Sequence, residues 1–330
     1  MADKALCRKL TEAIGAGESP LIQKIFGLLV DDDEAKILLA AAPPATTKEI
    51  SQKTGIPEGT IKTALESLFN RGLIFKTKKG EELKYYRVKN IPQMHDATSL
   101  TPGVSRKVLD AWKEYMEKEW PEYGQKIVDL LPASIMRVIP VNEAIEPESR
   151  ILVYDDVIKL IENAKTLAVT KCSCRVINGA CGKPLEVCMQ VDRAAEYSLE
   201  RGTGRAVSKS EALEILKMCE EEGLVHTADN RQVVGHVICN CCKGCCLNWS
   251  VMTGPKKWVA PSRFKALVDS DLCTGCENCP ERCFFDAIVV NDHLAVVDAE
   301  KCMGCGVCTV SCPTKALRLK EVRTADFVPV

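Results

Sequence analysis

The stretch VDSDLCTGCENCPERCFFDAIVV at residues 268–290 recurs 29 residues later as VDAEKCMGCGVCTVSCPTKALRL at residues 297–319. Each copy carries four cysteines with the spacing C-x2-C-x2-C-x3-C. Small residues between them, Gly275, Gly304 and Gly306, let backbone amides approach the sulfur atoms. Because thiolates are the preferred ligands of soft metals, the repeat predicts two metal centres near the end of the chain.

This repeat resembles the bacterial ferredoxins that hold two [4Fe–4S] clusters. The resemblance implies a ferredoxin-like domain of βαββαβ type at residues 261–330, in which the fourth cysteine of each run binds the other cluster. Zinc is the alternative, since C-x2-C pairs also bind zinc. The implied ligands of cluster 1 are Cys273, Cys276, Cys279 and Cys312, and those of cluster 2 are Cys302, Cys305, Cys308 and Cys283.

The sequence departs from this ferredoxin pattern at one position. The family usually has proline after the fourth cysteine of the first run, but Phe284 follows Cys283 here and a proline stands earlier, at Pro280. The second run keeps the usual Pro313. The departure therefore concerns the loop around cluster 2.

Apart from Cys219, nine further cysteines lie between residues 172 and 246, and thiolates there suit iron–sulfur clusters or zinc, with free thiols as a third reading. The segment resembles a cysteine-rich module of uncharacterised iron–sulfur proteins from anaerobes, which implies one or two more clusters. The first four cysteines and four of the last five are one plausible division, and sharing of ligands between the runs is an equal alternative. Adjacent cysteines cannot easily bind the same iron, so they serve different irons or one is spare. The nine are Cys172, Cys174, Cys181, Cys188, Cys239, Cys241, Cys242, Cys245 and Cys246.

The remaining cysteines and two histidines are expected to be structural residues and not metal ligands. Cys219 lies on the apolar side of an expected helix at residues 210–222, and we expect both it and Cys7 to be buried core residues. His226 and His236 flank the cysteine-rich module, and we expect them at satisfied or surface positions.

The N-terminal part has the pattern of three short helices followed by a hairpin, over residues 31–90. Thr46 and Glu49 form a capping box, and a helix at residues 57–70 follows it. The pattern resembles a winged helix-turn-helix domain, with the helix at 57–70 in the recognition position and residues 76–86 as the wing.

We therefore expect an α+β multidomain chain. Its domains would be a winged-helix-like domain at 1–95, a helical connector with short strands at 96–165, a cysteine-rich α/β module at 166–260 and the ferredoxin domain at 261–330. In the connector, large aromatic residues at helical spacing, including Trp112 and Trp120, should face the core. In the cysteine-rich module, residues 184–200 are expected to form a helix.

Composition and charge indicate where the protein works and which partners it has. The chain has 330 residues, 19 cysteines and a formal net charge of −1, and no run approaches the roughly eighteen apolar residues of a membrane span. Clustered cysteines without a secretory signal indicate reduced thiols in the cytoplasm, with no membrane insertion. Eight acidic residues against one arginine in residues 268–300 predict an electronegative face there, which favours redox partners with a basic docking surface.

Three functions fit the sequence. Flavin, nicotinamide, phosphate-loop and nucleophile–base motifs are lacking, so we expect a non-catalytic carrier or an oxidoreductase subunit that passes low-potential electrons between a donor and a partner enzyme. The main alternative is a redox-sensing winged-helix transcription regulator, since residues 48–89 hold ten basic against five acidic residues. DNA binding is not favoured. A reductase acting at a site-differentiated middle cluster is the third. The candidate phosphate contacts are Lys62, Arg71, Lys78 and Lys79.

Overall fold

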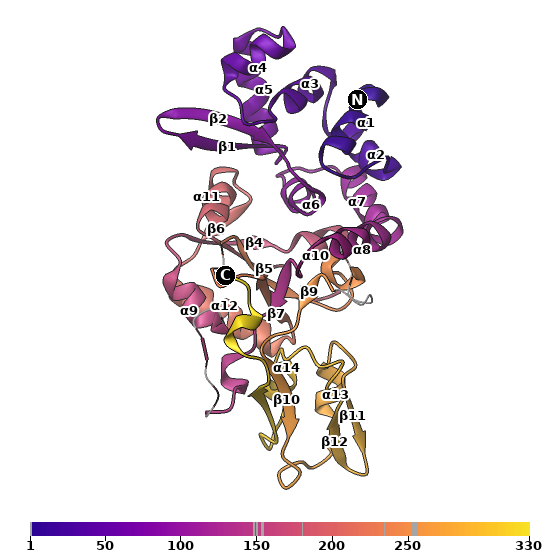
Figure 1. Cartoon of the computed structure of the whole chain (residues 1–330), viewed down its shortest axis with the longest axis vertical. Coiled ribbons are helices and arrows are strands. Elements are labelled where there is room, and N and C mark those ends of the chain that lie inside the picture. Colours follow the sequence, from indigo (N-terminus) through magenta and orange to yellow (C-terminus); the bar gives the residue numbers. More distant parts are fainter. Residues whose placement is uncertain are drawn as a thin grey trace. The chain divides into compact units, whose positions relative to one another are not determined.

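The fold is mixed α+β and consists of two units in a computed structural model (Figure 1). The first unit is Met1–Tyr123 with Val176–Gly179, and the second is Gly124–Arg175 with Ala180–Val330. We describe each unit by itself. The residues that the structure describes are 2–147, 149, 151–152, 155–179, 181–233, 235–251 and 257–330.

The first unit is helical with one hairpin. Two helices precede the expected three, and the three helices and the hairpin are all confirmed. Asp31 and Thr46 each close a capping box, so two helix starts are fixed by local hydrogen bonds. The elements are α1 (Lys4–Ala13), α2 (Pro20–Leu29), α3 (Asp32–Ala40), α4 (Thr47–Thr54), α5 (Glu58–Asn70), β1 (Ile74–Lys79) and β2 (Glu82–Arg87), and β1 and β2 pair antiparallel.

Helix α5 shows why this part folds as predicted. Its apolar residues repeat at helical spacing, and Ile61, Leu65, Leu68 and Phe69 are all buried. Its opposite face is exposed. Gly72, with φ of 76°, follows the helix and turns the chain into β1. The burial of one stripe thus orients α5 with a polar face toward solvent.

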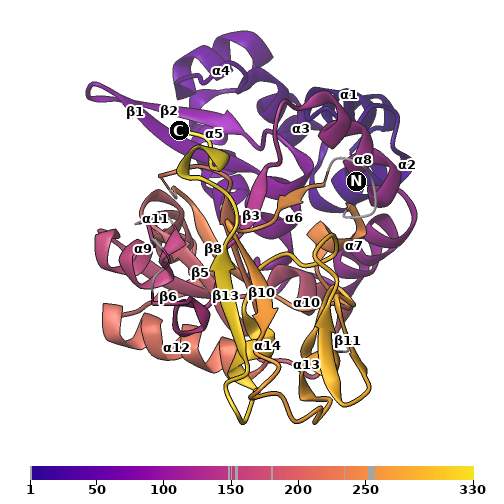
Figure 2. The same ribbon diagram turned by 60° about the horizontal axis from the view of Figure 1, so that its bottom comes forward.

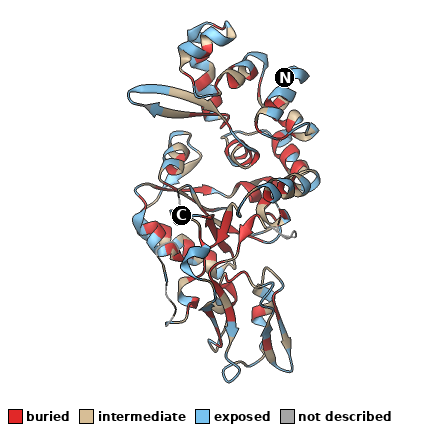
Figure 3. Ribbon diagram, in the orientation of Figure 1, coloured by how far each residue is buried: buried red, intermediate tan, exposed pale blue. Residues whose placement is uncertain are grey.

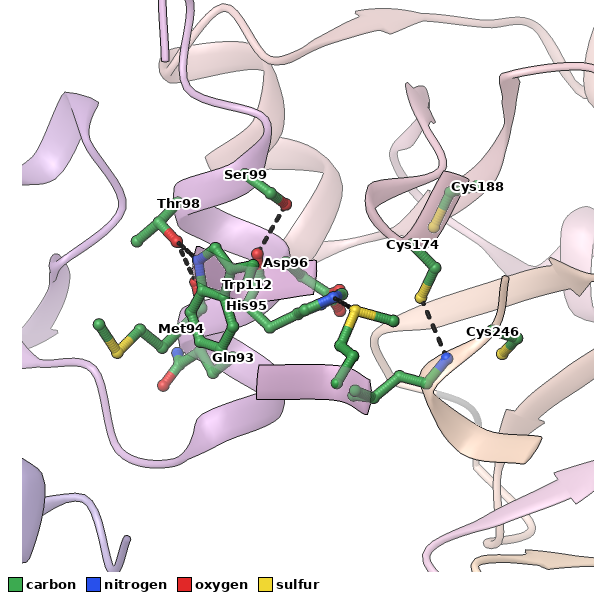
Figure 4. Close-up of polar contacts among 12 residues, drawn as sticks. Gln93, Met94, His95, Asp96, Thr98, Ser99, Trp112, Cys174, Cys188 and Cys246 are labelled. Carbon is green, nitrogen blue, oxygen red and sulfur yellow. Dashed lines mark hydrogen bonds and ion pairs between the residues drawn. The ribbon is translucent and has the colours of Figure 1, made fainter. Parts of the chain in front are cut away.

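Two more helices complete the core of this unit, α6 (Ile91–Ser99) and α7 (Arg106–Lys118). Trp112 is fully buried, as expected, and its indole N–H donates to Thr98 Oγ1 at 2.9 Å. His95 lies edge-on to Trp112 and contacts Met116 Sδ at 3.3 Å and Asp96 at 2.8 Å (Figure 4). Trp120, at the start of α8 (Trp120–Leu130), is buried too. The aromatic stripe is therefore core, as the sequence predicts.

The second unit is built on a seven-stranded sheet with the strand order β6-β4-β5-β8-β7-β3-β9. All neighbouring strands are antiparallel except β3 and β9, which are parallel. The central strands are largely buried (Figure 3). The strands are β3 (Met136–Val138), β4 (Leu167–Lys171), β5 (Glu186–Val191), β6 (Gly204–Ala206), β7 (Val225–Asp229), β8 (Val237–Cys241) and β9 (Val259–Ala260).

Helices α9 (Val157–Asn163) and α12 (Lys209–Glu221) pack on this sheet. Buried residues of both helices share a core with buried residues of β4, β5, β7 and β8. Cys219 on α12 is fully buried, as expected. Shorter helices α10 (Ser173–Asn178) and α11 (Arg193–Glu200) follow β4 and β5.

The expected helix at residues 184–200 is wrong in its first half. Residues 186–191 form β5, and only α11 is helical. The reason is a period of two, because Val187, Met189 and Val191 are buried while Cys188 and Gln190 between them are half-buried. A continuous helix would scatter these residues around its surface.

The end of the chain has the element order strand, helix, two strands, helix and strand. Its core includes Phe264, Ile288, Leu317 and several cysteines. Strand β10 pairs with β13, and β11 forms a hairpin with β12 (Figure 2). The elements are β10 (Phe264–Val268), α13 (Asn278–Arg282), β11 (Ile288–Asn291), β12 (Leu294–Val297), α14 (Val307–Val310) and β13 (Leu317–Glu321).

A buried ion pair fixes the start of β10. Arg263 is fully buried and donates through Nη1 to Asp155 at 2.7 Å, and its Nη2 contacts Glu321 on β13. Charged groups are buried only when they are paired and hydrogen-bonded. This pair therefore ties the segment before α9 to the last strand of the unit.

Candidate metal centres

Four cysteines from the two copies of the repeat line one cavity near the β11–β12 hairpin. Three come from the first run and one from the second: Cys273, Cys276, Cys279 and Cys312. Two of the other lining residues are Thr274 and Gly275 of the same loop. The structure thus brings together the set that the ferredoxin resemblance implies for cluster 1.

A second cavity lies between β10, β13 and helix α14. Its cysteines are Cys302, Cys305, Cys308 and Cys283. Phe285 and Met303 also line it and cover it with apolar surface. Here again three thiols come from one run and the fourth from the other, which is the set implied for cluster 2.

Backbone N–H groups point at the sulfur atoms in both cavities. Ala295 and Ala316 donate to Cys273 and Cys312 at 3.4 and 3.2 Å. In the other cavity, Ala266 donates to Cys302 at 3.4 Å and Ala287 to Cys283 at 3.3 Å. Such hydrogen bonds favour sulfur in its anionic form, which is the form that binds metals.

Burial makes three of these eight thiols unsuited to carry negative charge without a cation. It raises the pKa of Cys279 to about 11 and that of Cys305 to about 12. The pKa of Cys308 is raised as well, for the same reason. A bound cationic group would compensate four thiolates at each site, so the residues fit a [4Fe–4S] cluster.

The nine middle cysteines fall into groups that mix the two sequence runs, residues 172–188 and residues 239–246. Cys181, Cys242 and Cys245 form the three-thiol group, in which all three sulfur atoms lie within 4.8 Å of one another. The Cys242 and Cys181 sulfurs are 3.8 Å apart. The Lys183 backbone N–H helps to lower the pKa of Cys181, although burial opposes this. The group draws on a loop before β5 and on the turn after β8.

Five of the other six members form a chain of contacts that we call the five-thiol group: Cys174, Cys188, Cys239, Cys241 and Cys246. The Cys246 and Cys241 sulfurs are 3.4 Å apart, and the Leu247 N–H donates to Cys174 at 3.4 Å. Figure 4 shows Cys174, Cys188 and Cys246, which come from three different segments. Each of the two groups thus combines cysteines from both sequence runs.

Hydrogen bonds between buried sulfurs shift the pKa values of this group in opposite directions. The pKa of Cys239 is raised by its contacts with Cys188 and Cys241, and that of Cys246 by its contacts with Cys174 and Cys241. The pKa of Cys241 is lowered, because Cys239 and Cys246 donate to its sulfur. Cys174 and Cys241 are buried and the other three are half-buried, so five such thiols in a chain of contacts can become thiolates together only if a cation binds among them.

Adjacent cysteines separate cleanly between the two groups. In the turn C241-C-K-G-C-C246, the outer cysteines belong to the five-thiol group and the inner ones to the three-thiol group. Successive side chains of extended backbone point to opposite sides, so neighbours at the end of β8 diverge. This agrees with the expectation that Cys241 and Cys242 do not serve the same iron.

Cys172 and Arg175 lie beside both groups. Cys172 hydrogen-bonds Cys174, which raises its pKa, and also packs against the buried cluster that contains Cys242. The Arg175 guanidinium is buried and donates to the carbonyls of Pro184 and Asn240, each at 2.6 Å, while its Nε has no hydrogen-bond partner. Burial opposes its charge, but the thiolates of Cys172 and Cys242 raise its pKa overall.

Sequence reasoning missed the role of Arg175, although the motif C-S-C-R contained it. It noted Phe284 as a departure but missed its contact, since Phe284 packs against the buried cluster that holds Cys242 and Cys245. Phe284, Phe285 and Trp249 form an aromatic trio with ring centroids 5.4 to 5.9 Å apart. The large apolar residue after Cys283, where the ferredoxin pattern has proline, was the sequence feature that could have indicated this contact.

The remaining candidates are satisfied residues, as expected. His226 is buried and hydrogen-bonds Asn240 and Glu220, and the exposed His236 bonds Asp229 at 3.0 Å. Cys7 is buried in the first unit.

The acidic residues between 268 and 300 are all exposed. Four of them have structural partners. Asp286 pairs with Lys243 at 2.7 Å, and Glu300 lies 3.8 Å from Lys265. Asp298 accepts the N–H groups of Glu300 and Lys301, and Asp269 accepts that of Asp271. Glu277 lines the first cavity together with the exposed Cys276. At least one exposed carboxylate therefore lies at this cavity.

The basic residues of the first unit are mostly engaged within it. Arg71, expected to contact phosphate, instead bonds Glu34 and the Leu29 carbonyl. Lys76 lies 3.8 Å above the Phe69 ring. Lys62 and Lys78 are exposed, whereas the side chain of Lys79 lies outside the described residues. This leaves fewer charges for phosphate than the sequence suggests.

Among the described helices, none combines the length and apolarity that a bilayer crossing needs.

Comparison with known proteins finds two partial similarities. Residues 23–92 match the model of TrmB, the sugar-specific transcriptional regulator, and residues 295–318 match the 4Fe-4S binding domain. No curated protein and no solved structure matches. The first match supports a helical TrmB-like, winged-helix-type domain and a transcription-regulator role, and the second supports iron–sulfur binding and electron transfer.

Proposed function

We propose that the chain is an iron–sulfur electron-transfer protein or subunit that carries electrons between a low-potential donor and a partner oxidoreductase. The observation that supports this best is the pair of cavities, each lined by three cysteines of one repeat and one of the other. The match to the 4Fe-4S binding domain covers the second repeat. A ferredoxin-like fold with two [4Fe–4S] clusters accounts for both findings.

The residues of the chain would have three tasks. The cysteines hold the clusters, which when bound accept and release one electron each. The backbone N–H groups of Ala266, Ala287, Ala295 and Ala316 stabilise the charged sulfurs and so tune the potential. Phe285 and Met303 keep water from the cavity of Cys305, whereas the exposed Cys276 places the other cavity near the surface.

We further propose an iron–sulfur cluster in the cysteine-rich module, bound by members of the five-thiol group. Five buried or half-buried thiols in a chain of contacts need a cation to become thiolates together, and thiolates suit iron–sulfur clusters. The protein would work in the reducing cytoplasm, where all nineteen cysteines, which are free thiols here, stay reduced. The exposed acidic surface near Cys276 favours partners with a basic docking face.

Anaerobic isolation with counting of iron and acid-labile sulfide tests the proposal. We expect about eight of each from the two ferredoxin-type sites alone. Replacing all eight ferredoxin cysteines with serine should leave iron and sulfide above background if the middle module binds its own cluster. A preparation with zinc and no sulfide would refute the proposal as a whole.

A redox-sensing transcription regulator is the second candidate, and the TrmB match favours it. In this case α5 would lie on DNA, with Lys62 and Lys78 near phosphates. The exposed face of α5 also carries Glu58 and Glu66, which oppose such contacts. Binding to genomic fragments in the oxidised and reduced states separates the two functions. A tight complex with one defined site that changes with redox state would establish the regulator.

A further inference from the structure

The sulfur atoms of the three-thiol group are spaced for a single ion. In the described part of the chain, Cys181, Cys242 and Cys245 form the one set of three candidate ligand atoms that all lie within 4.8 Å of one another. Two thiolates on one tetrahedral zinc, with Zn–S bonds of about 2.3 Å, lie about 3.8 Å apart. The Cys181 and Cys242 sulfurs are 3.8 Å apart.

The ferredoxin cavities provide an internal comparison. Their eight cysteines surround open space that includes no set of three described ligand atoms within 4.8 Å. Sulfurs that enclose a four-iron core must lie further apart than sulfurs that share one ion. The contrast within one molecule therefore separates a cluster-type arrangement from a single-ion arrangement.

Local sequence supports the same reading. Cys242 and Cys245 form a C-x2-C turn after β8, which is a spacing that structural zinc sites use. Cys181 approaches this turn from a loop distant in sequence. Cys242 and Cys245 are buried and Cys181 is half-buried, so the group is shielded but not closed.

The charge at this site also balances around one divalent ion. Three thiolates and a divalent cation leave one negative charge. The buried guanidinium of Arg175 lies beside Cys242 and is held by the carbonyls of Pro184 and Asn240. A fixed positive charge next to a site with one excess negative charge lowers the cost of burying both.

We propose that Cys181, Cys242 and Cys245 bind a single thiophilic divalent ion, Zn²⁺ or Fe²⁺, through three thiolates. A fourth position is left for water or a small external ligand, which is the arrangement of reactive zinc sites. The site is separate from the five-thiol group. It does not depend on the electron-transfer function, since a single ion here is compatible with either function of the chain.

Metal and sulfide analysis of the anaerobically isolated full chain tests this. Cys242→Ser and Cys245→Ser should each lose one zinc or iron per chain while acid-labile sulfide stays unchanged. Cys219→Ser, which alters a buried thiol of the same apolar cluster outside the group, should retain the ion. Elemental analysis distinguishes zinc from iron, and unchanged sulfide shows that the ferredoxin-type sites remain intact.

One further variant and one further measurement keep the result interpretable if the serine variants fold poorly. Cys245→His supplies another zinc ligand and should retain the ion, and Co²⁺ loading of the full chain should give thiolate-to-cobalt absorption that Cys242→Ser abolishes. Loss of iron and sulfide together in Cys242→Ser would show a cluster and overturn the proposal. An unchanged metal content in both serine variants would overturn it too.

Discussion

A single methyl group at Gly275 should empty one ferredoxin-type site and leave the other filled. Gly275 has φ of 66°, and a Cβ atom there would lie 2.5 Å from the His293 carbonyl oxygen and 2.7 Å from the carbonyl carbon. Ordinary contacts begin at 3.4 Å, so the loop must move by about 0.9 Å from a backbone group that cannot rotate away. Ligand constellations tolerate shifts of only about 0.5 Å.

Gly275→Ala carries two separable costs. The left-handed backbone conformation costs an alanine about 1–2 kcal/mol wherever it occurs. Gly80→Ala is the matched control, because Gly80 has the same φ of 66° but nothing within 4 Å of the added methyl. Loss of the cluster bound by Cys273 and its partners requires the clash and not the conformation alone.

The assay is iron and sulfide content after anaerobic purification, with far-UV circular dichroism to show folding. Gly275→Ala should lose about four irons and four sulfides, and Gly80→Ala none. Gly304→Ala, whose Cβ would meet the Phe264 carbonyl group beside the other cavity, should lose a similar amount from that site. Full occupancy in folded Gly275→Ala would refute the reasoning, since it would show that the loop does not fix the ligands.

Three other outcomes follow from particular side chains. Arg263→Met leaves a buried carboxylate unpaired and should lower the free energy of unfolding by about 3–5 kcal/mol in chemical denaturation, so an unchanged midpoint would contradict a paired role. Glu277→Gln with Glu281→Gln should slow the reduction of the protein by a basic protein donor at low salt. Rates equal to wild type across a salt series would show that this acidic face takes no part in docking. Lys62→Gln with Lys78→Gln should reduce the salt slope of weak DNA binding by roughly two in anisotropy titrations, and an unaltered slope would remove both from the interface.

Local patterns predict local structure well in this chain. The capping box at Thr46 and the apolar repeat along α5 depend on residues within a few positions of one another, and both were predictable. Residues 184–200 were not, because an apolar period of two followed by a helical stretch resembles one amphipathic segment when read alone. Residues 186–191 form a strand because β5 pairs with β4 and β8, and these pairings join residues distant in sequence.

The same distinction applies to the cysteines. Each ferredoxin run has a spacing that restricts its geometry, so the implied ligand sets coincide with the two cavities. The middle cysteines have no such repeat, and their grouping depends on where β5, β8 and the loop of Cys181 meet. What could be predicted was that neighbours such as Cys241 and Cys242 diverge, because this depends on backbone geometry alone.

Phe284 shows how a departure from a family pattern can carry structural information. A proline after Cys283 would satisfy the ferredoxin loop, but its small ring could not reach the buried cluster that contains Cys242 and Cys245. Phe284 fills that contact, and Trp249, three residues beyond Cys246, packs against it. Arg282, on the other side of Cys283, donates to the carbonyls at the end of α12 at 2.7 and 3.0 Å. Both neighbours of Cys283, a proposed cluster ligand, therefore contact the cysteine-rich part, which indicates that the ferredoxin-type segment is fixed against the middle cysteines at Cys283.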